Sequence, residues 1–416
     1  MDKFFINGGN RLEGEISISC AKNSLLPILA GTILVNGQVI LKDVPKYRDV
    51  NAMCEILSSL GGVVVWQGDN LIIDCSNLDK NEISHELASP VRSSIFTLGP
   101  ILARLGSAKV SYPGGCDIGL RPIDIHLNAL RELGCKIIEK NGYIYGQKNK
   151  RLKNQVWLKF PSVGATENII MFASLFEGET IIYNPAKEPE IVDLANFLNK
   201  CGAKISGAGS DVVSIEGVKK LHGCEYKAIP DRIECGTFLI AGAMNEGDVL
   251  IKNAIIDHNS LLLEKLQLCG CKIVKGKKSI RLIAPKRLES FGDIETAVYP
   301  GFPTDLQPQM VALASVCNGC SIVFENVFES RFNYVGELLK MGCDIKFKSS
   351  VCIVRGKNKL YGADVCATDL RGGASLVLAA LYSEGYTTID KISLIDRGYY
   401  QFEQKLSSIG GDIKRI

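Results

Sequence analysis

Residues 246–251 read Glu-Gly-Asp-Val-Leu-Ile, and close equivalents of this hexapeptide recur along the chain. Its glycine follows an apolar segment long enough for a helix and precedes a short run of β-prone residues. Five other glycines have the same surroundings, and the six are separated by 69, 72, 69, 72 and 66 residues. They are Gly37 in NGQVIL, Gly106 in LGSAKV, Gly178 in EGETII, Gly247 in EGDVLI, Gly319 in NGCSIV and Gly385 in EGYTTI.

A second series of glycines runs in step with the first, at separations of 73, 68, 68, 72 and 68 residues. Each ends a predicted amphipathic helix and precedes another strand; ahead of Gly202, for example, Ile191, Leu194 and Leu198 lie at helical spacing. One large α/β sheet with chance glycine spacing would not explain two series in phase. The series comprises Gly61, Gly134, Gly202, Gly270, Gly342 and Gly410.

Each repeated unit, about 70 residues long, therefore reads helix, strand, helix, strand, with room for further strands. Six such units predict an α/β protein with two lobes of three units each. A chain of 416 residues exceeds the roughly 250–300 residues at which one hydrophobic core stops growing, which also favours two lobes. We expect the lobes to divide near Ile229-Pro230.

The composition is that of an ordinary globular protein and excludes several functions. Hydrophobic residues make up 46% and charged residues 22%, and a net charge of +3 is too small for a surface that coats nucleic acid. The longest apolar run, residues 25–35, falls short of the roughly 20 residues that cross a bilayer. No secretory signal is visible, so we expect a cytoplasmic protein without nucleic-acid or membrane partners.

The cysteines and histidines predict neither disulfides nor a metal centre. The cysteine count of 15 is odd and the residues are scattered, which favours free thiols in a reducing compartment. The one C-x-x-C, from Cys317 to Cys320, lacks a second pair at zinc-site spacing and is a weak metal or redox signal. The four histidines are too dispersed to form a metal site.

The first helix of each unit opens with polar or charged residues. Helix capping accounts for the acidic residues and the threonine among them, namely Asp231, Thr166, Asp305 and Asp369. It does not account for Lys22, Arg92 or Arg371, because a cation at the positive end of a helix is mildly unfavourable. These three residues therefore predict a bound anion. If the units pack symmetrically, the helix starts converge on one cleft between the lobes.

A glycine-rich loop at residues 113–122 joins a β-run to a helix and carries Cys116. Its glycines give the backbone freedom to close over a ligand. Two interpretations of Cys116 stay open at this stage: a reactive thiol, or a turn that happens to contain a cysteine. Neighbouring Asp117 argues against an unusually acidic thiol and suits a proton donor. Residues 162–167 likewise fit either a phosphate contact or an ordinary helix start.

Ordered matches along essentially the whole chain resemble the UDP-N-acetylglucosamine 1-carboxyvinyltransferases, a family of enolpyruvyl transferases. The resemblance implies two lobes, each an inside-out α/β barrel of three units. Residues 22–229 would form the first lobe, with the Cys116 loop, and residues 1–21 and 230–416 the second. The matching segments are residues 6–9, 21–23, 113–116, 121–122, 162–168, 188–193, 230–234, 302–305, 328–332, 368–371 and 395–399.

The resemblance also implies an enzyme and its reaction. The enolpyruvyl group of phosphoenolpyruvate would be transferred to the 3′-hydroxyl of UDP-N-acetylglucosamine, with release of phosphate, as the first committed step of peptidoglycan synthesis. Addition and then elimination would pass through a tetrahedral intermediate. No metal or other cofactor is implied, because arginines and a lysine neutralise the two polyanionic substrates.

The resemblance assigns roles to individual residues. Cys116 would protonate the methylene carbon and be alkylated by fosfomycin, Asp305 would take the hydroxyl proton, and Lys22, Arg397 and Asp369 would complete the catalytic set. The implied substrate contacts are Lys22, Asn23, Arg92, Arg121, Pro122, Ile123, Asp124, Ile125, Ser162, Val163, Gly164, Asp305, Val327, Arg331, Arg371 and Arg397.

Three alternatives remain at the level of sequence. An enolpyruvyl transferase acting on shikimate 3-phosphate shares the six-unit fold but does not rely on a loop cysteine. A nucleotide-sugar sensor could retain the fold without turnover, and a thiol such as Cys317 or Cys320 could sense redox state. The sequence indicates no particular oligomeric state.

Overall fold

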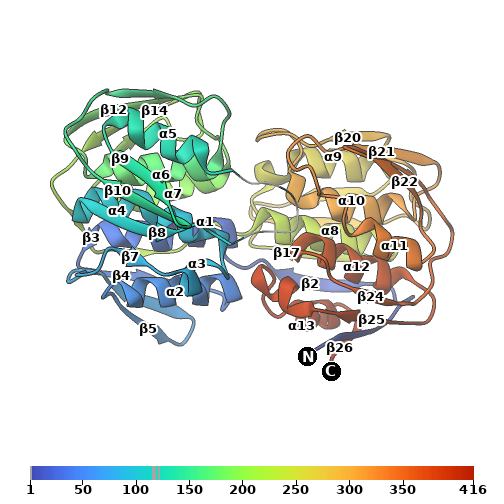
Figure 1. Cartoon of the computed structure of the whole chain (residues 1–416). Helices are drawn as coiled ribbons and strands as arrows, with labels where there is room; N and C mark the ends of the chain where they lie inside the picture. The colour runs from blue at the N-terminus through green and yellow to red at the C-terminus, as the bar shows by residue number, and fades with distance from the viewer. Residues whose placement is uncertain (1, 115–118, 120–121) are drawn as a thin grey trace. The chain divides into compact units, whose positions relative to one another are not determined.

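The computed structural model describes residues 2–114, 119 and 122–416. Contacts divide these residues into two compact units, and the boundary falls between Ile229 and Pro230. Unit 1 contains residues 2–19, 119 and 230–416, and unit 2 contains residues 20–114 and 122–229. The family resemblance implies a first boundary after residue 21, whereas the contacts place it after Ser19. The α/β class predicted from the repeats is confirmed, since helices and strands alternate through both units (Figure 1).

Six four-stranded sheets occur in the part of the chain that the structure describes, and all have the same pattern. In each sheet an edge strand pairs in parallel with its neighbour. The other two pairings in the sheet are antiparallel. In unit 2 the sheets are β16 (Glu225–Tyr226), β4 (Gln38–Leu41), β6 (Asn70–Asp74), β5 (Val63–Gln67); β7 (Glu82–Ile83), β8 (Ser107–Ser111), β10 (Tyr143–Gln147), β9 (Lys136–Lys140); and β11 (Gln155–Trp157), β12 (Gly178–Tyr183), β14 (Val212–Gly217), β13 (Lys204–Ser206). A two-stranded sheet pairs β3 (Val35–Asn36) with β15 (Leu221–His222).

The sheets of unit 1 follow the same order, but two of them include strands from the start of the chain. They are β2 (Glu13–Ser17), β17 (Asp248–Lys252), β19 (Ser279–Ile283), β18 (Lys272–Lys275); β20 (Asp293–Glu295), β21 (Cys320–Phe324), β23 (Val351–Arg355), β22 (Asp344–Lys348); and β24 (Asp364–Cys366), β25 (Tyr386–Asp390), β1 (Phe4–Asn7), β26 (Asp412–Arg415). Strand β1 is a central strand, because Ile6 pairs with Thr387 on one side and Ile413 on the other. The last sheet is therefore completed by the first strand of the chain.

Helices with apolar residues on every side fill the interior of each unit, because such helices must be buried. In unit 1, α8 (Arg232–Met244), α10 (Gln307–Ala314) and α12 (Leu370–Tyr382) pack against one another. In unit 2, α4 (Leu98–Leu105) and α6 (Val163–Ser174) pack together, and both contact the 3₁₀ helix η2 (Arg92–Thr97), as does α1 (Lys22–Gly31). Every residue of α8 from Ile233 to Met244 is buried.

The remaining helices are shorter or bury a smaller part of their surface. In unit 2 they are η1 (Thr32–Leu34), α2 (Arg48–Ser59), α3 (His85–Ala88), α5 (Asp124–Leu133) and α7 (Pro189–Lys200). In unit 1 they are η3 (Ile256–Asn259), α9 (Ser260–Leu268), η4 (Thr304–Leu306), α11 (Val335–Lys340), η5 (Ile392–Arg397) and α13 (Phe402–Ser408). None of the helices in the described ranges combines the length and apolar character needed to span a bilayer.

The repeat glycines occupy positions where another residue would be strained. All six members of the second series have φ between 91° and 116°, directly after a helix, and five members of the first series have φ between 80° and 123°. At position 247 a side chain would not fit, since a Cβ there would lie 2.7 Å from the carbonyl oxygens of Gly242 and Leu12. The periodicity in the sequence thus reflects recurring helix ends.

Candidate active site

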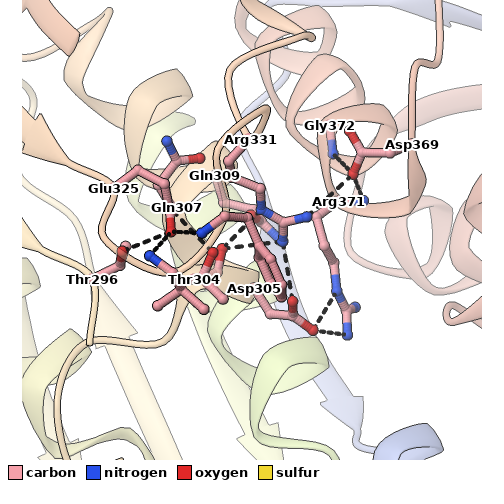
Figure 2. A network of polar contacts seen from close by, with 12 residues as sticks. Thr296, Thr304, Asp305, Gln307, Gln309, Glu325, Arg331, Asp369, Arg371 and Gly372 are labelled. Atoms are coloured by element: carbon pink, nitrogen blue, oxygen red, sulfur yellow. Dashed lines mark hydrogen bonds and ion pairs between the residues drawn. The ribbon is translucent and has the colours of Figure 1, made fainter. Parts of the chain in front are cut away.

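Asp305 lies between two arginines in unit 1 (Figure 2). Its Oδ1 accepts a hydrogen bond from Arg331 Nη2 at 3.0 Å, and its Oδ2 accepts from Arg371 Nη2 at 2.9 Å and Nε at 3.1 Å. Both arginine side chains are 2% exposed, whereas that of Asp305 is 28% exposed. The two guanidinium groups thus hold a carboxylate that remains accessible.

The charge of Arg371 depends on this carboxylate. Burial disfavours the guanidinium cation, but the negative charge of Asp305 acts against burial, and the pKa of Arg371 lies above its ordinary value. The guanidinium also lies 5.3 Å from the centre of the Tyr399 ring. Arg371 is therefore fixed as a permanent cation in the interior of unit 1.

Asp369 connects this cluster to the start of a buried helix. Its Oδ1 accepts hydrogen bonds from the backbone N–H groups of Arg371 at 3.0 Å and Gly372 at 3.1 Å, which caps α12. The same oxygen lies 3.6 Å from Arg331 Nη1. Arg331 thus bridges Asp305 and Asp369.

Glu325 holds a neighbouring loop in place and is absent from the residues predicted from the sequence. Its Oε1 accepts hydrogen bonds from Thr296 Oγ1 at 2.9 Å and from the backbone N–H groups of Val327 at 2.9 Å and Phe328 at 3.1 Å. Its Oε2 accepts from Thr304 Oγ1 at 2.9 Å. The side chain is buried, so these bonds fix Val327 relative to the residue that precedes Asp305. Its position as an acidic residue directly after the apolar strand β21 is the sequence feature that could have identified it.

In unit 2, Lys22 is the first residue of α1 and Asn23 the second. The N-cap residue, Ala21, makes no side-chain cap hydrogen bond, and Lys22 Nζ lies 3.5 Å from Asp49 Oδ2. Asp49 belongs to the first turn of α2 and its side chain is 6% exposed, while that of Lys22 is 12% exposed. The structure therefore brings a largely buried ion pair to the start of α1.

A second helix start in unit 2 contains Ser162, Val163 and Gly164. Ser162 caps α6 through its hydroxyl, which accepts from the backbone N–H of Ala165 at 3.4 Å, and Val163 and Gly164 open the helix. A Cβ at Gly164 would lie 2.9 Å from the ring of His126, so only glycine fits there. The backbone N–H groups of this turn form the type of donor set that binds anions.

The other predicted residues lie in separate elements. Arg92 opens η2, Pro122 and Ile123 precede α5, Asp124 and Ile125 begin α5, and Arg397 ends η5. Cys116 and Arg121 lie outside the described residues. Within unit 1 the structure therefore brings together Asp305, Arg331, Arg371 and Asp369, with Val327 attached through Glu325.

Two capping predictions are confirmed and two are wrong. Asp231 caps α8 and Asp369 caps α12. Thr166 lies inside α6, where its hydroxyl donates to the carbonyl of Ser162 at 2.8 Å, so the cap belongs four residues earlier. Asp305 lies within η4 and not at its N-cap, and its carboxylate accepts hydrogen bonds from Arg331 and Arg371.

The predicted need for an external anion is also modified. Two of the cations at helix starts form ion pairs within the protein: Arg371 pairs with Asp305, and Lys22 pairs with Asp49. Among the described residues, no cluster of three or more His, Cys, Asp or Glu side chains has the arrangement of a metal site. Cys317 is buried and donates to the carbonyl of Leu313, while Cys320 is exposed.

Solved structures define the class of protein. The enolpyruvyl transferase NikO from Streptomyces tendae is 25% identical in sequence, with a TM-score of 0.89 over 100% of this chain and 99% of that chain. An EPSP synthase from Acinetobacter baumannii shares the fold at 17% identity, with a TM-score of 0.77 and full coverage of both chains. The fold is therefore that of the enolpyruvyl transferases.

A sequence profile then identifies the family. Residues 6–406 match EPSP synthase (3-phosphoshikimate 1-carboxyvinyltransferase), and the chain belongs to this family. Its relatives include UDP-N-acetylglucosamine 1-carboxyvinyltransferase 2 of Caldanaerobacter subterraneus subsp. tengcongensis, which is 48% identical over 100% of both chains. UDP-N-acetylglucosamine 1-carboxyvinyltransferase of Thermodesulfovibrio yellowstonii is 47% identical, again over 100% of both chains.

Proposed function

We propose that this protein transfers the enolpyruvyl group of phosphoenolpyruvate to the 3′-hydroxyl of UDP-N-acetylglucosamine, releases phosphate and so begins peptidoglycan synthesis. The observation that carries this proposal is 47–48% identity over the whole chain to relatives named for that activity. The EPSP synthase of Acinetobacter baumannii, at 17% identity, shares only the fold.

The finer architecture is part of the proposal. Each unit is a lobe built as an inside-out α/β barrel, with three buried helices surrounded by three sheets. The common strand order of the six sheets and the buried helices α8, α10 and α12 support this arrangement. Such a lobe presents several helix starts at one end, where their positive dipoles attract phosphate groups.

The chemistry consists of an addition followed by an elimination. The sugar hydroxyl adds to the carbon of phosphoenolpyruvate that bears the phosphate, Asp305 accepts the hydroxyl proton, and Cys116 gives a proton to the methylene carbon. The resulting methyl group then loses a proton while phosphate leaves, which restores the double bond. Arg331 and Arg371 each donate to one carboxylate oxygen of Asp305 and so hold the proposed proton acceptor in a fixed orientation.

Cationic side chains and helix starts neutralise the substrates. Both substrates carry several negative charges, and fixed positive charges in a water-poor site stabilise them more strongly than bulk solvent does. In the proposal Lys22, Asn23, Arg331, Arg371 and Arg397 hold phosphoenolpyruvate and the departing phosphate, with assistance from Asp369. The remaining contacts, to the nucleotide and sugar, come from Arg92, Arg121, Pro122, Ile123, Asp124, Ile125, Ser162, Val163, Gly164, Asp305 and Val327.

The choice of acceptor is tested by phosphate release from phosphoenolpyruvate at a fixed concentration. We expect release with UDP-N-acetylglucosamine and none above background with shikimate 3-phosphate. Release with shikimate 3-phosphate alone would reject the proposal in favour of the other branch of the family. Tight binding of the sugar nucleotide without any turnover would favour a sensor.

The role of Cys116 is tested with fosfomycin. The epoxide should alkylate this thiol, and peptide mass analysis should find the adduct on the peptide that contains residue 116. Cys116→Asp should retain turnover, because a carboxylic acid can donate the proton, and should abolish labelling. Inhibition without any modification of this peptide would remove Cys116 from the mechanism.

A further inference from the structure

Two cysteines of unit 2 have their sulfur atoms in contact. Cys201 Sγ lies 3.3 Å from Cys224 Sγ. Cys201 directly follows α7, and Cys224 directly precedes β16, the parallel edge strand of the first sheet. The two residues are 23 positions apart in the sequence, so the fold itself brings the thiols together.

The backbone on both sides of this pair is anchored. The carbonyl of Cys201 accepts from the backbone N–H of His222 at 2.8 Å, and the carbonyl of Cys224 accepts from the backbone N–H of Ile40 at 2.9 Å. A disulfide needs sulfurs about 2 Å apart. The sulfurs would therefore have to approach each other by only about an ångström, which is within the reach of side-chain rotation.

The two thiols differ in chemistry and in access. Cys201 is buried, whereas Cys224 is partly exposed. The hydrogen bond from Cys201 lowers the pKa of Cys224, and the nearby charge of Lys200 acts in the same direction against the effect of burial. The same hydrogen bond and burial raise the pKa of Cys201. Cys224 is consequently the thiol of the pair that ionises more readily and is accessible to solvent.

We propose that Cys224 and Cys201 form an oxidation site for hydroperoxides, in which Cys224 reacts first and Cys201 resolves the product into a disulfide. The Cys224 thiolate attacks one oxygen of the peroxide, the O–O bond breaks, and Cys224 becomes a sulfenic acid while the peroxide is reduced to water or an alcohol. Cys201 sulfur then attacks the sulfenic sulfur, the S–O bond breaks and water leaves with the Cys201 proton. Two thiols are oxidised and one peroxide is reduced.

A buried pair in unit 1 provides the internal comparison. Cys317 interacts with Cys269, so these thiols are also neighbours, but both are buried. A peroxide cannot reach either sulfur without opening of the core, and the Cys317 thiol donates to the carbonyl of Leu313 at 3.2 Å. Contact alone therefore predicts two disulfides, whereas contact together with access predicts only the Cys201–Cys224 disulfide.

The disulfide would connect the end of α7 to the edge strand of the first sheet. It closes a chain segment within unit 2 and restricts the unfolded state of that segment. We expect the oxidised protein to unfold at a temperature several degrees higher than the reduced protein. The shift should disappear after treatment with dithiothreitol.

The test uses the full chain, reduced and then exposed to stoichiometric hydrogen peroxide. Remaining thiols are blocked with N-ethylmaleimide, and peptides are analysed by mass spectrometry without reduction. We expect a peptide pair linked through Cys201 and Cys224 that dithiothreitol separates. Its absence under conditions that oxidise the exposed thiol of Cys320 would overturn the proposal.

Single variants assign the order of the two steps. Cys201→Ser should stop the reaction at the sulfenic acid of Cys224, which dimedone captures. In Cys224→Ser, Cys201 should stay largely reduced. Its oxidation should be at least about tenfold slower than in the unmodified chain. Cys269→Ser, the matched control, should leave the yield of the linked peptide unchanged. Oxidation of Cys201 at an undiminished rate in Cys224→Ser would contradict the assigned order.

Discussion

At the scale of single residues, the central feature is one carboxylate that neutralises two buried arginines. Asp305 is the only described acidic side chain within hydrogen-bond distance of both Arg331 and Arg371. It therefore has a structural duty in addition to its proposed chemical one. Removing its charge should affect folding stability and turnover together.

The variant Asp305→Asn tests both duties. It keeps the size of the side chain but removes the carboxylate bound to buried Arg371 and leaves buried Arg331 with Asp369 at 3.6 Å, which should lower the free energy of unfolding by about 3 kcal/mol. Phosphate release should fall by at least about a hundredfold, because the acceptor of the hydroxyl proton is lost. Urea unfolding and the phosphate assay measure the two effects. Asp293→Asn, at an exposed position on β20, is the control and should change neither quantity.

Glu325 acts as a positioning residue, since it holds Val327 and Thr304 without being placed against substrate. In Glu325→Gln one acceptor oxygen becomes a donor, so at least one of its four hydrogen bonds is lost. We expect KM for the sugar nucleotide to rise about tenfold with a smaller change in kcat, because substrate positioning suffers more than chemistry. A fall in kcat alone would assign Glu325 a different role. Glu264→Gln, on the exposed side of α9, serves as the control.

Glu167 imposes a pH dependence on stability. Burial, followed by the charges of Glu190 and Glu188, raises its pKa well above the ordinary value of 4.5. The folded chain then binds this proton more tightly than the unfolded chain, so stability falls as pH rises from 4.5 through the raised pKa. Glu167→Gln should remove this loss. The variant's unfolding temperature should therefore exceed that of the unmodified chain by more at pH 8 than at pH 5.

The comparison for Glu167 is Glu177→Gln, an exposed glutamate that follows the same helix. Unfolding temperatures of both variants and the unmodified chain are measured between pH 5 and pH 8. Glu177→Gln should follow the unmodified chain at every pH. The same pH slope in Glu167→Gln as in the unmodified chain would exclude Glu167 as its source.

At the scale of elements, the helices were predictable and the sheet closures were not. Glycine periodicity marks helix ends because only glycine readily adopts the positive φ found there. Strand pairing between distant parts of the chain leaves no such local mark. The pairing of β1 with β25 and β26, and of β16 with β4, follows from tertiary packing.

The central position of β1 makes it essential to unit 1. Ile6 is fully buried in the core of this unit. Ile6→Ala should lower the free energy of unfolding by about 3 kcal/mol, through lost burial and the cavity left behind. Arg11→Ala, at an exposed position in the same N-terminal segment, should change it by less than about 0.5 kcal/mol. Equal effects of the two changes would show that β1 is a dispensable edge.

At the scale of the whole molecule, the repeat pattern and the cations at helix starts predicted a six-unit α/β protein that binds an anion, and the family resemblance implied the enzymatic reaction. The partners of the site residues could not be predicted, because Arg331, Arg371 and Asp305 meet only after their elements fold. Glu325 was missed for the same reason, since its role depends on Thr296 and Thr304. The helix-start pattern identified Arg371 and the resemblance identified Arg331, while the tertiary structure shows which carboxylates bind them.

The proposed function predicts a specific transfer of carbon between two substrates. Phosphoenolpyruvate labelled with ¹³C is incubated with the protein and UDP-N-acetylglucosamine, and the nucleotide sugar is isolated and examined by NMR. We expect the label in an enol ether at the 3′-oxygen of the sugar, in amounts equal to the phosphate released. Unlabelled UDP-N-acetylglucosamine recovered alongside released phosphate, or label found only when shikimate 3-phosphate is supplied, would contradict the proposed transfer.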